Sequence, residues 1–366
     1  MIFGAGKRPP QTRPGRRILL AVILSGLLLA GRPGRAVVSG PCSDCHTMHY
    51  SQDGGVLSEW GPNGPYQALL VHDCVGCHTG SNTSGGEHLY VFDPNGPVYG
   101  DTGTGPASTT LAGGDFYWVT GSDSCGHNVS GIAAADAALA TPPGFDGGRP
   151  AGDGSIPGNG SWPSGTQITC AGTYGCHGSH TNPNPAGALR GGHHGISGPA
   201  ITNPRNDASD YRMLVGIAGY EDPEREFRPE FNRHNQYKGI DSPESSDTST
   251  ISSLCARCHG LFHDDVTDSS ASPWLRHPVN YDLGRTPTNS EYRNYGGTGH
   301  LYQVATPVGS ADVSQALGSV TFNDDTIITC LSCHRAHGSP FYKSLRWDYR
   351  GSVTGGYCGN CHTTKD

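Results

Sequence analysis

The hydrophobic residues of this 366-residue chain form one long run and otherwise short, scattered clusters. The run is ILLAVILSGLLLA, residues 18–30. Beyond it, no stretch keeps a helical period of hydrophobic positions for more than about three turns, so the pattern does not predict a helix bundle. The segment Asp115–Val119, with the sequence DFYWV, predicts a short buried strand because aromatic and β-branched residues favour strands.

The apolar run has the surroundings of an export signal. Residues 1–36 carry no acidic residue and seven basic ones: Lys7, Arg8, Arg13, Arg16, Arg17, Arg32 and Arg35. The run is short for a membrane span, and small residues favour cleavage after Ala36. We therefore expect residues 1–36 to be a signal peptide and the mature protein to be exported without a membrane span, to the periplasm, the outer surface or the extracellular space. The alternative is a retained N-terminal anchor.

The composition argues against an ordinary hydrophobic core. The chain contains 55 glycines and 27 prolines, and hydrophobic residues make up only 34%. Chains of this kind need covalent staples or bound groups to hold a fold. The cysteines provide candidates for both roles.

Twelve of the 13 cysteines lie in six motifs that end in Cys-His. Five are Cys-x-x-Cys-His: Cys42/Cys45/His46, Cys74/Cys77/His78, Cys255/Cys258/His259, Cys330/Cys333/His334 and Cys358/Cys361/His362. The sixth is stretched to Cys-x5-Cys-His, with Cys170, Cys176 and His177 in the run CAGTYGCH.

This spacing is that of covalent haem c attachment, in which both thiols bind the haem vinyl groups and the histidine binds iron. Structural zinc and a disulfide framework are the alternatives, but neither needs a histidine after every second cysteine. In the stretched copy, three extra residues must loop out, and Gly172 and Gly175 make such a bulge cheap. Cys125 is left over, either as a buried free thiol or in a disulfide with Cys170. We therefore predict six covalently attached haems c.

If haems take the place of a hydrophobic core, the motifs predict the fold class and the regions of the chain. We expect a loop-rich multihaem cytochrome with low secondary structure, short helices at the motifs, few short strands and a core of stacked haems. One domain, residues 37–366, would follow the signal peptide. Within it, residues 37–100 carry haems 1 and 2, residues 101–250 carry haem 3, and residues 251–366 carry haems 4 to 6. The Gly/Pro-rich stretch 144–165 is expected to be a surface loop.

Twelve of the 18 histidines lie outside the motifs, which is enough for a second imidazole on every iron. The predicted second ligands are His49, His127, His193 or His194, His234, His263, His277 and His337. His49 and His337 each follow a motif histidine by three residues, so each is placed to reach a neighbouring haem. For His72, His88 and His300, an ordinary hydrogen-bonding role is favoured.

The net charge restricts the partners. Removing the seven basic residues of the signal leaves 17 basic and 32 acidic residues, a net charge of −15. Nucleic acid and anionic membranes are therefore poor partners. Other redox proteins and extracellular metal acceptors fit better.

Several strings carry a family resemblance: CSDCHTMHYS, GHNVSGI, HNQYKG, SPWLRHP and CLSCHRAHGSP. They resemble multihaem cytochromes exported by dissimilatory metal-reducing bacteria, among them hexahaem cytochromes that polymerise into extracellular nanowires. The resemblance implies haems stacked in a line with two histidines on each iron. It also implies a homopolymer in which His49 ligates a haem of the adjacent subunit. The stretched motif departs from the regular hexahaem pattern.

Two functions follow from these features. The first is electron transfer without enzymatic activity, since an iron with two imidazoles has no position for a substrate. The second is a multihaem oxidoreductase of the nitrite or hydroxylamine type with one open haem. No Cys-x-x-Cys-Lys motif marks such a haem in the sequence, and the stretched site at His177 would be its candidate.

Overall fold

The computed structural model describes residues 1, 4, 46, 73–86, 88–99, 108–157, 160–189, 210–242, 247–263, 277–350 and 357–364. The chain divides into two compact units, Met1–Arg35 and Ala36–Asp366. Apart from Met1 and Gly4, the predicted signal peptide lies outside the described residues. The predicted site residues Cys42, Cys45, His49, His193 and His194 also lie outside them.

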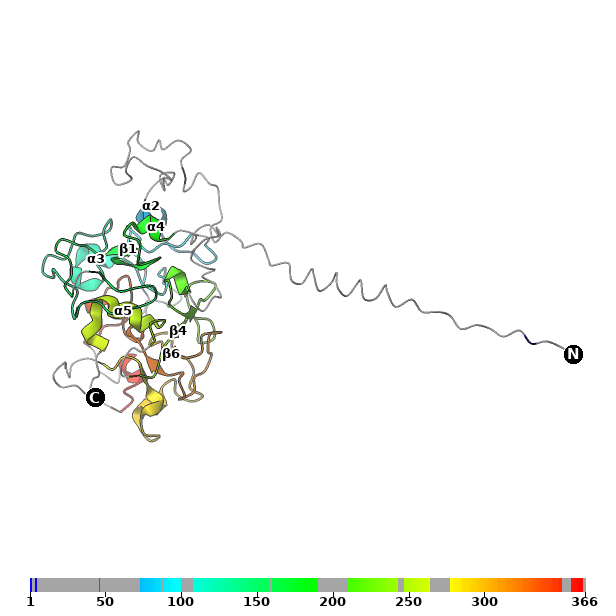
Figure 1. Cartoon of the computed structure of the whole chain (residues 1–366). Helices are drawn as coiled ribbons and strands as arrows, with labels where there is room; N and C mark the ends of the chain where they lie inside the picture. Colours follow the sequence, from blue (N-terminus) through cyan, green and yellow to red (C-terminus); the bar gives the residue numbers. More distant parts are fainter. Residues whose placement is uncertain are drawn as a thin grey trace. The chain divides into compact units, whose positions relative to one another are not determined.

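Helices in the described part are short and sit between long irregular segments (Figure 1). The α-helices are α2 (Cys74–His78), α3 (Tyr117–Gly121), α4 (Pro185–Ala188) and α5 (Ile251–His259). The 3-10 helices are η5 (Asp123–Cys125), η6 (Tyr211–Met213), η7 (Gly260–His263), η8 (Leu283–Arg285), η9 (Glu291–Asn294), η10 (Cys330–Ser332), η11 (Tyr342–Ser344) and η12 (Tyr357–Asn360). None of the described helices has the length and hydropathy to cross a membrane.

The strands in the described ranges form two small sheets. The strands are β1 (Thr169–Ala171), β2 (Gly175–His177), β3 (Gly219–Tyr220), β4 (Gln236–Lys238), β5 (Tyr281–Asp282), β6 (Gly309–Ser310) and β7 (Ile327–Ile328). Five of them make a sheet of order β3-β4-β6-β7-β5, in which only β4 and β6 run parallel. The other sheet is the parallel pair β1-β2.

Among the described residues, hydrophobic packing is divided among three small clusters instead of one core. The first surrounds Tyr211 and Tyr237, the second Tyr295 and Tyr302, and the third Phe116. Each brings together side chains that lie far apart in the sequence. This arrangement confirms the predicted loop-rich fold with short helices and few strands.

The prediction of a strand at Asp115–Val119 is wrong, because helix α3 begins at Tyr117. The Asp115 carboxylate accepts hydrogen bonds from the backbone N–H groups of Tyr117, at 2.8 Å, and Asp93, at 3.2 Å. An acceptor at this position favours a helical turn. Phe116 and Val119 are still buried, as the hydrophobic pattern indicates.

The Gly/Pro-rich stretch 144–165 is irregular, as expected, but it is not wholly at the surface. Ala151 is fully buried in the first hydrophobic cluster, and Ile156 is also buried. Asp153 and Gly154 hydrogen-bond to residues near the stretched motif. The low hydropathy of the stretch concealed these contacts, because backbone carbonyls and one carboxylate make them.

Candidate haem sites

Two attachment motifs lie on α-helices. Helix α2 contains the whole motif Cys74–His78, and helix α5 ends with Cys255, Cys258 and His259. The Asp73 side chain caps α2, and the Thr250 side chain caps α5. Side chains three residues apart lie on one side of a helix, with Cβ atoms about 5–6 Å apart, so both thiols face one haem edge.

The fifth and sixth motifs lie on 3-10 turns. Helix η10 begins at Cys330 behind a capping box formed by Thr329 and Ser332. Helix η12 contains Cys358. The four regular motifs in the described part therefore all begin in helical turns, as predicted.

The second cysteines of all four regular motifs in the described part are partly buried, including Cys258 on α5. Cys77 lies on α2, three residues after Cys74, and Cys333 and Cys361 hold the same position in the fifth and sixth motifs. The structure thus gives Cys77 the position that attachment needs. Thioether formation at Cys77 stays a prediction.

The first motif is described only at its histidine. His46 is described and partly buried, whereas its cysteines, Cys42 and Cys45, lie outside the described residues. The described residues contain no group of three or more His, Cys, Asp or Glu side chains that could hold a metal ion. His46 and Cys77 therefore do not belong to such a group. The role of His46 as an iron ligand therefore stays a prediction from the motif.

The stretched motif uses strands instead of a helix. Strands β1 and β2 run parallel in a register that pairs Thr169 with Gly175 and Ala171 with His177, so Cys170 lies opposite Cys176. Facing residues of neighbouring strands are about 4.8 Å apart and point to the same side. The expanded loop thus gives the two thiols nearly the spacing of a helical Cys-x-x-Cys pair.

Two glycines allow this tight loop, as the sequence indicated. Gly172 has φ +88°, a conformation that L side chains rarely adopt. A Cβ on Gly175 would lie 2.5 Å from backbone atoms of Ala171. Three extra residues can therefore loop out while the two cysteines stay side by side.

The motif histidines are held in the tautomer that a metal ligand needs. Nδ1–H donates to the carbonyl of Leu89 from His78 (2.7 Å), of Arg212 from His177 (3.1 Å), of Pro143 from His259 (2.7 Å) and of Lys343 from His334 (2.9 Å). A carbonyl only accepts hydrogen bonds, so Nδ1 carries the proton and the lone pair is on Nε2.

Three motif histidines each face a second imidazole. The ring centroids are 6.4 Å apart for His177 and His337, 6.1 Å for His259 and His127, and 6.0 Å for His362 and His277. Two metal–nitrogen bonds of about 2 Å each, plus roughly 1.1 Å from each nitrogen to its ring centre, give a similar separation across one metal ion. These spacings fit an iron between the two rings of each pair.

Burial keeps the imidazoles of the first two pairs neutral, which is the form that binds a metal. It lowers the pKa of His177 and of His259 to about 4 and that of His337 to about 3. It also lowers the pKa of His127.

The segment His334–His337 connects three of the sites. His334 is the fifth motif histidine, and the carbonyl of Ala336 accepts a hydrogen bond from His127 Nδ1–H (2.7 Å). His337 faces His177 and stacks on Phe116. His337 faces the third motif histidine, and His127, which hydrogen-bonds to Ala336, faces the fourth. Residues 334–337 therefore contact the third, fourth and fifth sites.

Gly113 makes room for His337. A Cβ on Gly113 would lie 2.8 Å from Nδ1 of His337, and the Gly113 carbonyl accepts the His337 backbone N–H. Sequence reasoning did not find this residue, because a single glycine among 55 carries no distinguishing signal.

Two predicted second ligands have other surroundings. His234 is fully buried, stacks on Tyr302, and turns Nδ1 and Nε2 toward the carbonyls of Asn235 and Leu317. It has no nitrogen left for iron, so the structure does not support a ligand role for it. His263 is buried with Nε2 3.8 Å from the Cys330 thiol, and no ring contact pairs it with a motif histidine in the described residues.

The cysteines also bring motifs together. The thiols of Cys74 and Cys170 lie close enough to shift each other's pKa, and so do those of Cys255 and Cys330. The second motif therefore adjoins the third, and the fourth adjoins the fifth. The alternative of a Cys125–Cys170 disulfide is wrong, because both thiols are free and Cys170 neighbours Cys74; Cys125 is only partly buried.

The donor set fits haem c: paired thiols, each followed by a histidine, with a second imidazole at iron-spanning distance in three sites. These features define a multihaem c-type cytochrome with covalently bound haem. Comparison with known proteins agrees, since the family model for the doubled CXXCH motif matches residues 324–366.

The chain is similar to C-type cytochrome OmcS of Geobacter sulfurreducens, with 26% identity over 92% of this chain and 86% of the relative. Two solved structures are also similar, each covering 87% of this chain and 86% of the other. They are the Outer Membrane Cytochrome S filament from Geobacter sulfurreducens (20% identity, TM-score 0.41) and the OmcS nanowires from the same organism (22% identity, TM-score 0.44). The resemblance to nanowire cytochromes predicted from the sequence is confirmed.

Proposed function

We propose that this protein is an electron carrier that holds six haems c, each with two axial imidazoles, and delivers electrons outside the cytoplasm. The observation that carries the proposal is the set of three imidazole pairs with ring centroids 6.0–6.4 Å apart. Haem supplies reversible one-electron chemistry at its iron, and the protein sets its ligands, spacing and exposure.

Two imidazoles on an iron leave no position for a substrate, so the protein is not an enzyme. The test is a spectrum of the native, fully assembled protein. All irons should be low-spin in the ferric state, and the reduced protein should not bind carbon monoxide. A high-spin signal in that material would contradict the proposal.

The count of six includes the stretched motif. The β1-β2 register supports it, because the register places Cys170 opposite Cys176. The intact mass of mature protein, made in a host that attaches haem c, should exceed the polypeptide mass by six haems. A mass with five haems, unchanged by Cys176→Ala, would show that this motif is not used.

The protein assembles head to tail through His49. Three motif histidines have an imidazole opposite, whereas no ring faces His334 among the described residues, and His334 is exposed. His49 of a neighbouring subunit is the second ligand of the His334 haem. The likeness to a cytochrome that forms filaments supports this arrangement, in which each subunit completes a site of the next.

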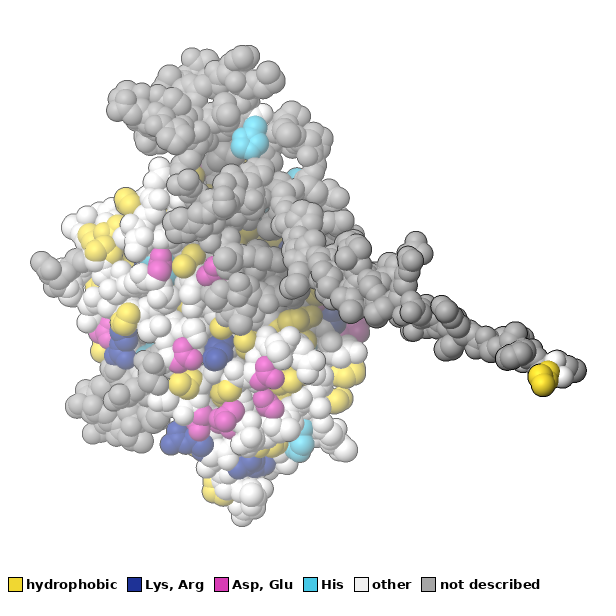
Figure 2. Space-filling view, turned by 45° about the vertical axis from the view of Figure 1, so that its right-hand side comes forward, with side chains coloured by type: hydrophobic (Ala, Val, Ile, Leu, Met, Phe, Trp, Pro, Cys, Tyr) yellow, Lys and Arg dark blue, Asp and Glu magenta, His cyan; other side chains and the backbone are white. Residues whose placement is uncertain are grey.

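The partners are other redox proteins and extracellular metal acceptors, reached after export past the signal peptide 1–36. The excess of acidic residues supports this choice and disfavours nucleic acid. On the described surface in Figure 2, acidic and basic side chains are interspersed among polar and hydrophobic ones. Fractionation of native cells should therefore recover the haem-stained protein outside the cytoplasm.

The exposed His334 also favours one competing function, an oxidoreductase with an open iron at that haem. The site at His177, which the sequence indicated for such an enzyme, is a poorer candidate because His337 faces it. The two functions differ in assembled material. An open His334 haem would bind carbon monoxide even in filaments, whereas a haem completed by His49 would not.

A further inference from the structure

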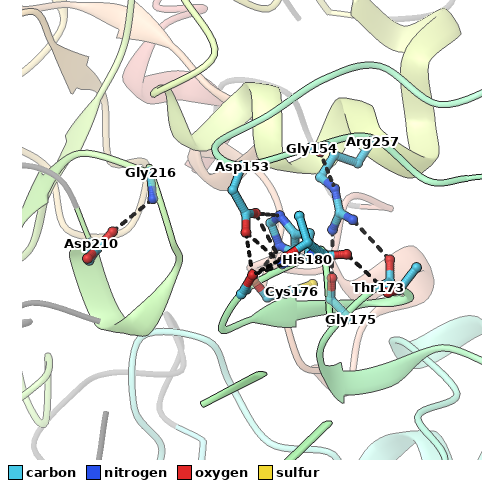
Figure 3. Close-up of polar contacts among 11 residues, drawn as sticks. Asp153, Gly154, Thr173, Gly175, Cys176, His180, Asp210, Gly216 and Arg257 are labelled. Atoms are coloured by element: carbon cyan, nitrogen blue, oxygen red, sulfur yellow. Dashed lines mark hydrogen bonds and ion pairs between the residues drawn. The ribbon is translucent and has the colours of Figure 1, made fainter. Parts of the chain in front are cut away.

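The expanded loop of the third motif is held by a side chain from the fourth. Arg257 lies between the two cysteines of the fourth motif, on helix α5. Its guanidinium donates from Nη2 to the carbonyl of Thr173, at 2.9 Å, and from Nη1 to that of Gly175, at 2.8 Å. Figure 3 shows both bonds, which reach across from α5 to the loop between β1 and β2.

Arg257 is one of the largest fully buried side chains, with 1% of its surface exposed. Its third bond runs from Nε to the carbonyl of Gly154, at 3.0 Å. Carbonyl dipoles therefore surround a buried charge, and such an arrangement has to be maintained, because a buried charge without partners is strongly destabilising. Two of the three acceptors belong to the loop that the stretched spacing creates.

A second contact holds the other end of the loop. His180 Nε2 lies 3.2 Å from the carbonyl of Cys176, and its Nδ1 lies 2.8 Å from Asp153. The Asp153 carboxylate also accepts hydrogen bonds from the His180 backbone N–H (Figure 3). It accepts another from the Ser179 hydroxyl. Asp153 directly precedes Gly154, so both contacts on the loop are anchored in the same segment.

A helical Cys-x-x-Cys-His motif holds its thiols in register by backbone hydrogen bonds within the turn. In the expanded loop, the short pairing of β1 with β2 replaces these backbone hydrogen bonds. We propose that Arg257, assisted by the Asp153–His180 pair, is a positioning residue that holds Cys170 and Cys176 in register for covalent attachment of the third haem. Attachment at the third motif thus depends on a residue of the fourth. This inference rests on the proposed use of six haems.

The first test compares Arg257→Gln with wild type and with the control Arg350→Gln. Arg350 is an exposed arginine that pairs with Asp348 at the surface. Mass spectrometry of proteolytic peptides measures haem occupancy at each motif. Arg257→Gln should lower occupancy of the Cys170–His177 peptide by roughly tenfold or more while the other motifs stay loaded. Arg350→Gln should match wild type at every motif.

Two results of this first test would overturn the proposal. Full occupancy at the third motif in Arg257→Gln would show that the clamp is not needed. A uniform loss at all six motifs would assign Arg257 to general folding instead of to this loop.

The second test removes the need for the clamp. Deleting Gly172, Thr173 and Tyr174 converts CAGTYGCH to the regular motif CAGCH. The shortened chain should still carry haem there, and adding Arg257→Gln should not lower that occupancy. A purely structural arginine would be needed equally in both backgrounds, so an equal loss in the shortened chain would overturn the proposal. Failure of the shortened chain itself to attach haem would overturn it as well, because the loop would then do more than set thiol spacing.

The outcome is separable from that of the six-haem proposal. Five haems on the wild-type protein would refute the count of six. Six haems on both wild type and Arg257→Gln would refute only the positioning role.

Discussion

At the scale of single residues, the environment of each histidine distinguishes a ligand from a structural side chain. His337 faces His177 at a distance that fits an iron between them, while His234 has a carbonyl at each ring nitrogen. His234 is buried and His337 is partly buried. The sequence predicted both as ligands, although only His337 follows a motif histidine by three residues. The difference arises from Gly113 and Leu317, which are distant in the chain.

His337→Ala should open the iron of the third haem. We expect about one sixth of the iron to become high-spin, because one of six second ligands is lost. Electron paramagnetic resonance of the ferric protein measures this fraction. His300→Ala is the matched control: its Nδ1 donates to the Tyr295 carbonyl, no imidazole ring faces it in the described residues, and its loss should leave every iron low-spin. An entirely low-spin His337→Ala protein would exclude His337 as a ligand.

His234→Ala should have the opposite signature. Its removal takes away the imidazole N–H that donates to the carbonyl of Asn235 or of Leu317 and empties the space beside Tyr302, so the free energy of unfolding should fall by about 1–3 kcal/mol. Urea denaturation followed by the haem absorption band measures the loss. The iron should stay low-spin, and a high-spin fraction would restore His234 to the ligand set.

At the scale of elements, the sequence predicted the attachment motifs better than the secondary structure around them. Cysteine spacing alone located the helical turns at four motifs, because attachment of two thiols to one haem edge restricts the backbone there. It did not reveal that the third motif is a parallel strand pair, since that depends on Arg257 and His180 from elsewhere. The aromatic content of Asp115–Val119 favoured a strand, but the Asp115 carboxylate caps a turn.

Asp115 should make stability depend on pH. Burial raises its pKa from 3.8 to about 6, and the negative charge of the nearby Asp93 carboxylate also raises it. The hydrogen bonds from the backbone N–H groups of Tyr117 and Asp93 lower the pKa but do not outweigh burial. The folded state therefore holds the proton more tightly, so this contribution to stability is full below pH 3.8 and is lost as pH rises through about 6. The expected cost at neutral pH is on the order of 1–3 kcal/mol.

Asp115→Asn keeps the acceptor oxygen without the charge, so it should be more stable than wild type at pH 7. That advantage should shrink as pH falls from about 6 to 4. Urea midpoints of both proteins at several pH values within this window provide the measurement. A difference that does not change with pH would show that Asp115 does not titrate in the folded protein.

At the scale of the whole molecule, the described residues pack in small hydrophobic clusters and in contacts between attachment motifs instead of one core. The segment His334–His337 contacts the third, fourth and fifth sites. The neighbouring thiols Cys74 and Cys170 connect the second motif with the third, and Cys255 and Cys330 connect the fourth with the fifth. The low hydrophobic content predicted that haems would fill the interior. The order in which the sites meet could not be predicted, because it depends on the conformation of long irregular segments.

The proposed second ligand of the His334 haem predicts how the subunits join. If His49 completes the His334 haem of the next subunit, His49→Ala should leave six haems attached, abolish filaments, and expose one high-spin iron per subunit. Electron microscopy and the resonance spectrum measure the last two effects, and intact mass measures the first. His88→Ala is a suitable control, because His88 stacks on Tyr90 within its own chain. A wild-type protein that stays monomeric at high concentration with six low-spin haems would place the second ligand of His334 within the same subunit.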